Sequence, residues 1–227
     1  MRVGIHQPNF LPWRGFFSKI QASDTFVLLD DVQFERGKTF TSRTKIALNG
    51  TALWLTIPVL EKSKLRRISE IQVDPSFAWK RKHLNTLFHA YKKTLGFSQV
   101  FPAIERVYDQ PFDFLVQYNL AFIESIASCL ELEVDFVRSS TLPGAEEAGW
   151  DKIKCILVQT QAQEYISGSG AGSKRYVNEQ ELQSMGINVV WQSPPQQEYV
   201  QPHSPHFMPD LSVVDFLFNT CPPYFLS

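Results

Sequence analysis

Three polar side chains lie within a few residues of each other near the start of the chain. His6 ends a short apolar run, and Gln7 and Asn9 follow it in a turn that also contains Pro8. A histidine at such a turn can bind or protonate a phosphate oxygen, helped by the partial positive charge at the start of the helix expected after Pro12. The two prolines also make the turn rigid, so a purely structural role is the alternative.

Two further polar groups directly follow apolar runs. They are Asp30, Asp31 and Gln33 in the first half of the chain, and Ser139 and Ser140 in the second half. Asp30 joins His6 as a candidate catalytic residue. The two carboxylates indicate a site that holds Mg²⁺ with a nucleotide, or that accepts hydrogen bonds from ribose hydroxyls. The alternative is a solvated turn after a strand, where aspartate is common.

A glycine- and serine-rich loop late in the chain offers backbone N–H groups, which cradle phosphates in many proteins. Its candidate ligand-binding residues are Gly168, Ser169, Gly170, Lys174 and Tyr176. The glycine spacing matches neither G-x-G-x-x-G nor G-x-x-x-x-G-K-[ST]. A flexible connection between two elements is therefore the alternative.

Single residues elsewhere allow similar pairs of interpretations. Arg43 is a candidate contact for an anionic ligand, although such a residue more often lies on a solvated strand face. His83 is expected at the boundary of an apolar helix face, and Asn119 is expected to be buried and hydrogen-bonded. Asp215 follows Ser212 by three residues, a spacing typical of a helix cap.

The elements that position these residues alternate between strands and helices. Compact apolar runs predict strands over 2–6, 25–29, 134–138, 164–167 and 187–191. Apolar residues at helical spacing follow three of these runs. They predict a helix after Pro12, which follows 2–6, and helices over 150–161 and 178–185, which follow 134–138 and 164–167. This alternation predicts an α/β fold with a mainly parallel sheet that helices cover on both faces. Residues 1–227 are expected to form a single domain of this kind.

Two segments interrupt the alternation. Residues 32–75 read as a small β insertion with strands over 45–48, 53–59 and 68–73, and Asn49-Gly50 is a strong hairpin signal. Residues 77–132 read as a helical segment, with helices over 77–95, 98–108 and 112–132. A closing helix is expected over 211–218.

Ligands of parallel sheets bind outside the carboxyl ends of the strands. The polar groups described above follow predicted strands, so they are expected to emerge at one edge of the sheet. We therefore expect His6, Asn9, Asp30, Gln33 and Ser169 to line one pocket. Trp13 or Tyr176 would stack there on a base or sugar ring.

Composition narrows the class of partner and the compartment. With 22 basic and 23 acidic residues the formal charge is −1, so no nucleic acid is expected as the main partner. No apolar run is long enough for a transmembrane segment, and no signal-peptide pattern opens the sequence, so a soluble, cytoplasmic protein is expected. The three cysteines lack metal-ligand spacing, so no metal site is expected from them and all should be reduced thiols.

Several sequence segments resemble the WbqC-like protein family. They are IHQPNFLPWRGFFSKI, SDTFVLLDDVQF, TSRTKI, WLTIPV, YISGSGAGSKRYV and MPDLSVVDFLF. The matching motif residues are His6, Gln7, Pro8, Asn9, Pro12, Trp13, Gly15, Asp24, Asp30, Gln33, Arg43, Trp54, Pro58, Gly168 and Tyr176. The resemblance implies a bacterial protein linked to surface-polysaccharide (O-antigen) gene sets.

The resemblance and the polar strand ends together indicate a transferase of surface-polysaccharide biosynthesis. It would act on a nucleotide-activated amino sugar or transfer a nucleotide-activated acyl or aminoacyl group. Such chemistry consists mostly of positioning and charge stabilisation. The expected partner is a small-molecule nucleotide or sugar nucleotide. The alternative is a non-catalytic module that binds a sugar nucleotide or a partner enzyme.

Overall fold

Two units of the chain are built from interleaved segments of the sequence. The computed structural model describes residues 1–35, 37, 39–60, 66–144, 146–170, 173–174, 177–202, 204 and 206–221. The first unit combines residues 1–7, 15–32 and 133–195, and the second combines 8–14, 33–132 and 196–227.

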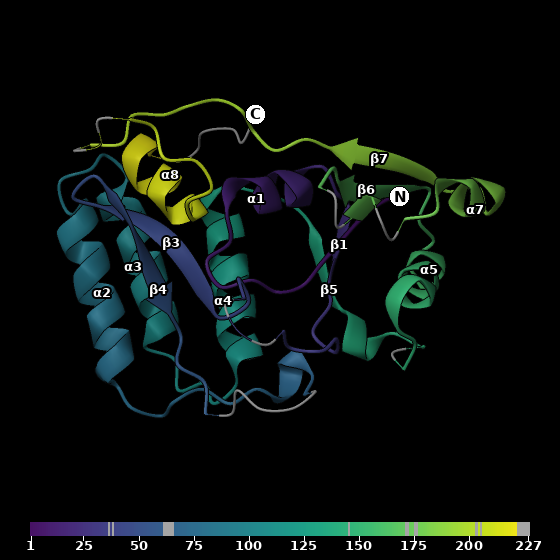
Figure 1. The fold of residues 1–227 in the computed structure, drawn as a ribbon, viewed down its shortest axis with the longest axis horizontal. Helices are drawn as coiled ribbons and strands as arrows, with labels where there is room; N and C mark the ends of the chain where they lie inside the picture. Colours follow the sequence, from purple (N-terminus) through teal and green to yellow (C-terminus); the bar gives the residue numbers. More distant parts are fainter. Residues whose placement is uncertain are drawn as a thin grey trace. The chain divides into compact units, whose positions relative to one another are not determined.

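The first unit contains a five-stranded sheet in which every neighbouring pair is parallel (Figure 1). Its strands are β1 (Arg2–His6), β2 (Thr25–Leu28), β5 (Asp135–Arg138), β6 (Glu164–Gly168) and β7 (Asn188–Gln192). Their order across the sheet is β5-β2-β1-β6-β7. The apolar runs become strands because both faces of the central strands are buried.

Helices cover the two faces of this sheet. Val3, Ile5 and Val27 share one core cluster with Ile156 of α5 (Gly149–Gln159) and Leu182 of α7 (Glu179–Ser184). Successive side chains of a strand point to opposite faces. The residues between these therefore face the other way, toward α1 (Arg14–Gln21).

Aromatic rings make the contact between the sheet and α1. The Phe16 ring lies 5.3 Å from that of Phe26 and 5.0 Å from that of His6, both edge to face. Gly4 permits this close approach. A Cβ atom there would lie 2.5 Å from the Ser23 Oγ and 2.6 Å from the Phe26 ring.

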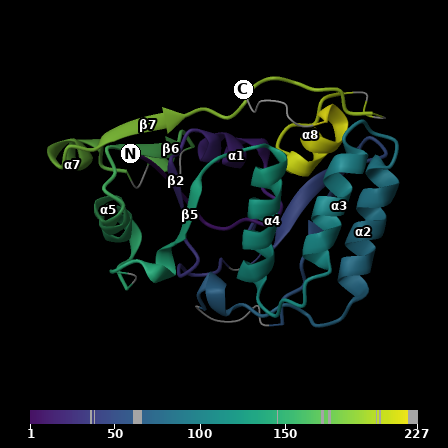
Figure 2. The same ribbon diagram turned by 180° about the vertical axis from the view of Figure 1, so that it is seen from behind.

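The second unit contains an antiparallel hairpin and several helices. The hairpin pairs β3 (Arg43–Leu48) with β4 (Thr51–Thr56). Asn49 and Gly50 turn between them with φ of 50° and 74°, as the hairpin signal predicts. Figures 1 and 2 show α2 (Ala78–Tyr91), α3 (Phe97–Tyr108) and α4 (Leu115–Cys129) side by side, and α8 (Val213–Thr220) closes the described chain.

The predicted fold class is confirmed: a mainly parallel α/β sheet, a small β insertion and a helical segment. One predicted strand is wrong. Residues 68–73 form the 3-10 helix η1 (Ile68–Glu70) and two isolated bridges, because Ile68 turns into the core instead of alternating along a strand. Within the described residues, no helix is long and apolar enough to cross a membrane.

Candidate functional site

The strand order of the first unit reverses between β1 and β6. From β1 the chain moves outward to β2 and β5, and it then returns to the other side of β1 to form β6 and β7. In open parallel sheets, ligands bind at the carboxyl ends of the two strands that flank such a reversal. The carboxyl ends of β1 and β6 carry His6 and Gly168, two of the predicted site residues.

The strands β1 and β6 stop pairing before their carboxyl ends. Their pairing reaches only Gly4 opposite Ile166. On the outer sides, β1 stays paired with β2 as far as His6, and β6 stays paired with β7 as far as Gly168. The backbone between β1 and β6 at this edge is therefore available to groups other than the neighbouring strand. We call this place the β1–β6 split.

Lys19 of α1 reaches into the β1–β6 split. The His6 carbonyl accepts from the Leu29 N–H on the β2 side, so the preceding Ile5 carbonyl points toward β6. That carbonyl accepts a hydrogen bond of 2.7 Å from the Lys19 Nζ. Lys19 is only 5% exposed, and no carboxylate in the described part of the chain pairs with it. Burial lowers the pKa of Lys19 to about 7.

His6 is neutral and has one ring nitrogen already engaged. Its Nδ1 lies 2.9 Å from the Gln7 carbonyl, which can only accept, so the Nδ1 carries the proton. The Nε2 is therefore a lone-pair acceptor. Burial, and then the charge of Lys19, lower the pKa of His6 to about 4. At neutral pH, His6 can accept a hydrogen bond from a hydroxyl or amine but carries no charge.

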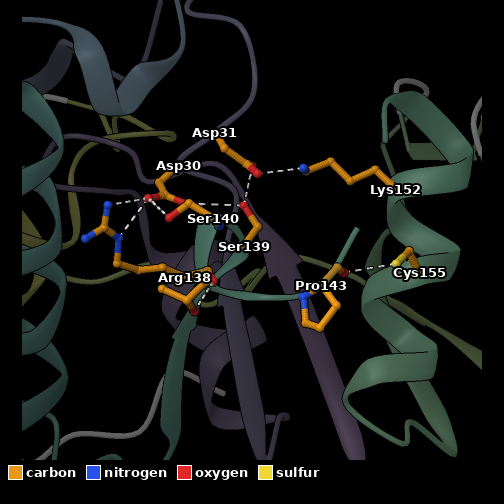
Figure 3. Close-up of polar contacts among 9 residues, drawn as sticks. Asp30, Asp31, Arg138, Ser139, Ser140, Pro143, Lys152 and Cys155 are labelled. Atoms are coloured by element: carbon orange, nitrogen blue, oxygen red, sulfur yellow. Dashed lines mark hydrogen bonds and ion pairs between the residues drawn. The ribbon is translucent and has the colours of Figure 1, made fainter. Parts of the chain in front are cut away.

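Asp30 is fully buried, and both of its carboxylate oxygens are engaged (Figure 3). The Oδ2 accepts from the Arg138 Nε at 2.7 Å and from the Ser140 hydroxyl at 2.8 Å. The Oδ1 accepts from the Ser140 N–H at 3.0 Å. Burial alone would raise the pKa of Asp30, but the hydrogen bonds from Ser140 and Arg138 together lower it. The carboxylate therefore ties the end of β2 to the end of β5.

Asp31 forms a second pair beside the first. Its Oδ2 accepts from the Lys152 Nζ of α5 at 2.7 Å, and both partners are buried. Ser139, in the 3-10 helix η2 (Ser139–Thr141), directs its hydroxyl to both Asp31 and Asp30 (Figure 3). Each aspartate is thus matched by one cation and by serine donors.

These contacts do not fit the expected Mg²⁺ site. Mg²⁺ needs carboxylate oxygens with lone pairs directed to it, and those of Asp30 and Asp31 already face Arg138, Lys152 and the serines. Within the described ranges, no group of three or more His, Cys, Asp or Glu side chains is arranged to hold a metal ion.

The glycine-rich loop begins by extending the sheet. The Ser169 N–H donates to the Gln192 carbonyl at the end of β7, so this donor is used within the fold. Beyond it, the exposed Lys174 lies over the Trp191 ring, 5.8 Å from its centroid. Tyr176 lies outside the described residues. The loop therefore contributes the half-buried Gly168 and Ser169, and the exposed Gly170, to the edge next to the β1–β6 split.

Most of the remaining predicted site residues belong to the second unit. Asn9 is buried, Trp13 forms an isolated bridge with Ser212, and Gln33 is exposed and bridges Arg67. The second unit also contains Arg43, whose guanidinium carbon lies 3.8 Å from the centroid of the Trp54 ring. Gln7 is the last residue of its segment in the first unit and is half-buried.

Three charged residues of this edge could not be identified from the sequence: Lys19, Lys152 and Arg138. Lys19 flanks the apolar stripe of its helix, where a lysine ordinarily extends to solvent. Lys152 lies in a helix whose other lysine, Lys154, forms an exposed ion-pair network. Arg138 ends β5 and is half-exposed. Arg138 and Lys152 could have been anticipated in kind, because two adjacent aspartates after a buried strand require cationic partners.

Comparison with known proteins gives a family but no described activity. The WbqC-like protein family matches residues 7–224. A protein of Mycobacterium tuberculosis (strain ATCC 25618 / H37Rv), described as uncharacterized protein Rv1507c, is 28% identical over 221 residues. That alignment covers 96% of this chain and 93% of the relative. No solved structure matches. Because the family match covers most of the sequence, the chain belongs to the WbqC-like protein family.

Proposed function

We propose that this protein is a transferase of bacterial surface-polysaccharide biosynthesis that uses a nucleotide-activated substrate. That substrate is a nucleotide-activated amino sugar, or a nucleotide that carries an activated acyl or aminoacyl group. One observation carries the proposal: a buried lysine, which no carboxylate of the described residues pairs with, lies in the split between β1 and β6, where the strand order reverses. Parallel sheets bind nucleotides at such a position.

The charge distribution of the edge favours an anion beside Lys19. Asp30 is matched by Arg138, and Asp31 is matched by Lys152. These pairs leave Lys19 as the buried cation that a phosphate would stabilise. A bound phosphate would also raise the pKa of Lys19, because an opposite charge favours the protonated form. The free lysine, with a pKa of about 7, is thus ready to become charged as the nucleotide arrives.

His6 suits a different part of the reaction. Its free Nε2 accepts a hydrogen bond, so its natural partner is the hydroxyl or amine of the acceptor group, not a phosphate oxygen. Such a contact orients the attacking atom, and orientation supplies a large part of the rate in group transfer. The proton that leaves the attacking group passes to solvent, because Lys19 beside a bound phosphate is protonated and cannot accept it.

A non-catalytic binding module is the second candidate. The observation that favours it is the full engagement of Asp30 and Asp31, which leaves neither carboxylate as a general base. In this case, Lys19 and His6 would recognise the nucleotide and no bond would be broken.

Calorimetric titration followed by product analysis distinguishes the two candidates. The purified protein is titrated with ATP, UDP and UDP-N-acetylglucosamine, and small molecules that copurify with it are identified by mass spectrometry. Binding that weakens about tenfold or more in Lys19→Met supports the nucleotide site. Incubation of the bound nucleotide with the copurified molecules then yields a transferred product if the protein is an enzyme, and an unchanged mixture if it is a binding module. Failure of all three nucleotides to bind contradicts both.

A further inference from the structure

A second site is suggested by a cavity whose described lining residues all belong to the second unit. Its volume is about 640 Å³, which is within the range of small-molecule sites. One wall comes from α2, whose residues Trp79, Lys82, His83 and Thr86 line it. Their spacing of three and four residues places them on one helix face. The opposite wall comes from β4 and the residues that follow it, up to Val59.

Exposed aromatic side chains border this cavity. Trp54, in its lining, is 39% exposed, and Phe40 beside it is 51% exposed, with ring centroids 5.9 Å apart. Arg43 stacks its guanidinium on the Trp54 ring at 3.8 Å. Burying aromatic rings of this size is a large source of stabilisation, so aromatic surface left exposed at a cavity points to a ligand that covers it.

The lining is cationic and contains no acidic side chain among its described residues. Arg43 and the exposed Lys82 contribute positive charge. His83 contributes none, because its Nδ1 is engaged with the Tyr108 hydroxyl at 3.0 Å and burial lowers the pKa of His83 to about 4. At neutral pH, His83 therefore forms an uncharged part of the wall.

We propose that this cavity binds a small organic anion with a flat apolar body. The apolar body stacks against Trp54 and the face of α2, and its carboxylate or phosphate lies near Lys82. This inference goes beyond the proposed function and does not depend on it. Each lining residue that the structure describes belongs to the second unit, whereas Lys19 and His6 belong to the first.

A matched pair of probes tests the proposal by calorimetric titration of the full chain. 1-Naphthoate supplies the flat apolar body with a negative charge, and 1-naphthamide supplies the same body without the charge. We expect saturable binding of naphthoate with an affinity at least about tenfold above that of the amide, the size of effect typical of one charge-assisted contact. Equal affinities for the two probes, or no saturable binding of naphthoate, would overturn the proposal.

Variants then locate the binding. Lys82→Gln should weaken naphthoate binding about three- to tenfold and leave the amide unchanged. Arg81→Gln, with the same loss of charge at a neighbouring exposed position outside the cavity, should match the wild type. Thr86→Trp should fill the cavity and abolish the binding of naphthoate while nucleotide titrations stay unchanged. Wild-type affinity in a folded Thr86→Trp protein contradicts the assignment.

Trp54→Leu gives an independent readout if Thr86→Trp does not fold. It keeps an apolar side chain at the rim but removes the stacking surface. We expect the affinity for naphthoate to fall at least about fivefold, since base- or ring-stacking on tryptophan contributes on that scale. An unchanged affinity would place the anion elsewhere and overturn the proposal.

Discussion

His6 lies at the sheet edge as a neutral ring with its Nδ1 bonded to Gln7 and its Nε2 left as an acceptor. His6→Ala removes that acceptor and an edge-to-face contact with Phe16. We expect the affinity for a bound sugar nucleotide to fall about three- to tenfold, the effect of one lost hydrogen bond. We expect a small change in melting temperature. Thermal melts beside calorimetric titrations measure both, with His89→Ala, an exposed histidine of α2, as the control. A large loss of stability with unchanged affinity would identify His6 as a structural turn residue.

The lowered pKa of Lys19 predicts that nucleotide binding depends on pH. Its pKa of about 7 means that it is charged below this pH and neutral above it in the free protein. Affinity for UDP-N-acetylglucosamine, whose diphosphate does not titrate in this range, should fall as the pH rises from 6 to 8.5. His6, with a pKa of about 4, stays neutral throughout this range and adds no slope.

Two variants serve as controls for this pH profile. Lys19→Met should bind weakly with no pH dependence. Lys93→Met, which removes an exposed lysine of the second unit, should reproduce the wild-type curve. A wild-type affinity that is flat across the pH range would argue against Lys19 as the phosphate partner.

Some single-residue predictions succeed because one physical rule decides them. Asn119 is expected to be buried and bonded, and its side-chain amide donates to the carbonyls of Pro8 and Thr41 at 2.8 Å each. Asp215 follows a helix cap as its spacing predicts, since the Ser212 hydroxyl accepts from the Val214 N–H. The sequence gives no sign that Asp215 is also fully buried and accepts hydrogen bonds from two tyrosine hydroxyls, because those partners are distant in the chain.

At the scale of elements, hydrogen bonds between Asp30 and η2 hold the end of β2 against the end of β5. Asp30→Asn replaces a carboxylate that accepts from Arg138, Ser139 and Ser140 with an amide that cannot accept at both atoms. We expect a loss of about 2–4 kcal/mol in the free energy of unfolding, because donors and a half-exposed guanidinium lose their partner. Asp135→Asn removes the same charge at an exposed position of β5 and should cost little.

The pH dependence of this loss follows from the lowered pKa of Asp30. A carboxylate whose pKa is lower in the folded state stabilises the fold above its unfolded pKa and loses this effect as the pH falls through the folded value. The stability gap between wild type and Asp30→Asn should therefore stay constant from pH 7 to about pH 5 and shrink below about pH 4. Chemical denaturation across this range measures the gap. A gap that widens in acid would contradict the assigned pairing.

Elements are predictable where periodicity and burial agree. The five strands of the sheet lie within one residue of their predicted bounds, because buried parallel strands leave compact apolar runs. The strand predicted over residues 68–73 is wrong because Ile68, Ile71 and Val73 are all buried without forming a continuous strand. The candidate site could be predicted from the sequence only in part. His6, Asp30 and Gly168 could be predicted because they lie at strand ends. Lys19 could not, because the spacing of apolar residues in a helix does not reveal which flanking lysine turns toward the sheet.

At the scale of the whole molecule, the cysteines provide a simple test. Among the described residues, Cys129, Cys155 and Cys221 form no disulfide with one another, and their reduced state in solution stays a prediction. Titration of the unfolded protein without reductant should give three thiol equivalents. Fewer equivalents would mean that an intermolecular bond or another modification has formed.

The grouping of site residues is a further prediction at this scale. His6, Asp30 and Ser169 belong to the first unit, at the carboxyl edge of its sheet. Asn9 and Gln33 belong to the second unit, so the expectation that all five line one pocket stays a prediction, as does the single domain. Crosslinking or labelling of Asn9→Cys and Gln33→Cys variants, with and without nucleotide, would test it. Protection of both by the nucleotide is the expected outcome, and protection of neither would contradict it.

The interleaved order of the two units has a consequence for how the protein is made. The chain changes unit after residues 7, 14, 32, 132 and 195. On the ribosome, β1 and β2 emerge long before β6, which pairs with β1 from more than a hundred residues away. The central strand of the sheet must therefore wait, with one edge open, until most of the chain has been synthesised. Folding that depends on such distant pairings is slow and exposes nascent strand edges to aggregation. Overproduction in a heterologous host should therefore gain more from slower translation or added chaperones than from stabilising substitutions in any one helix.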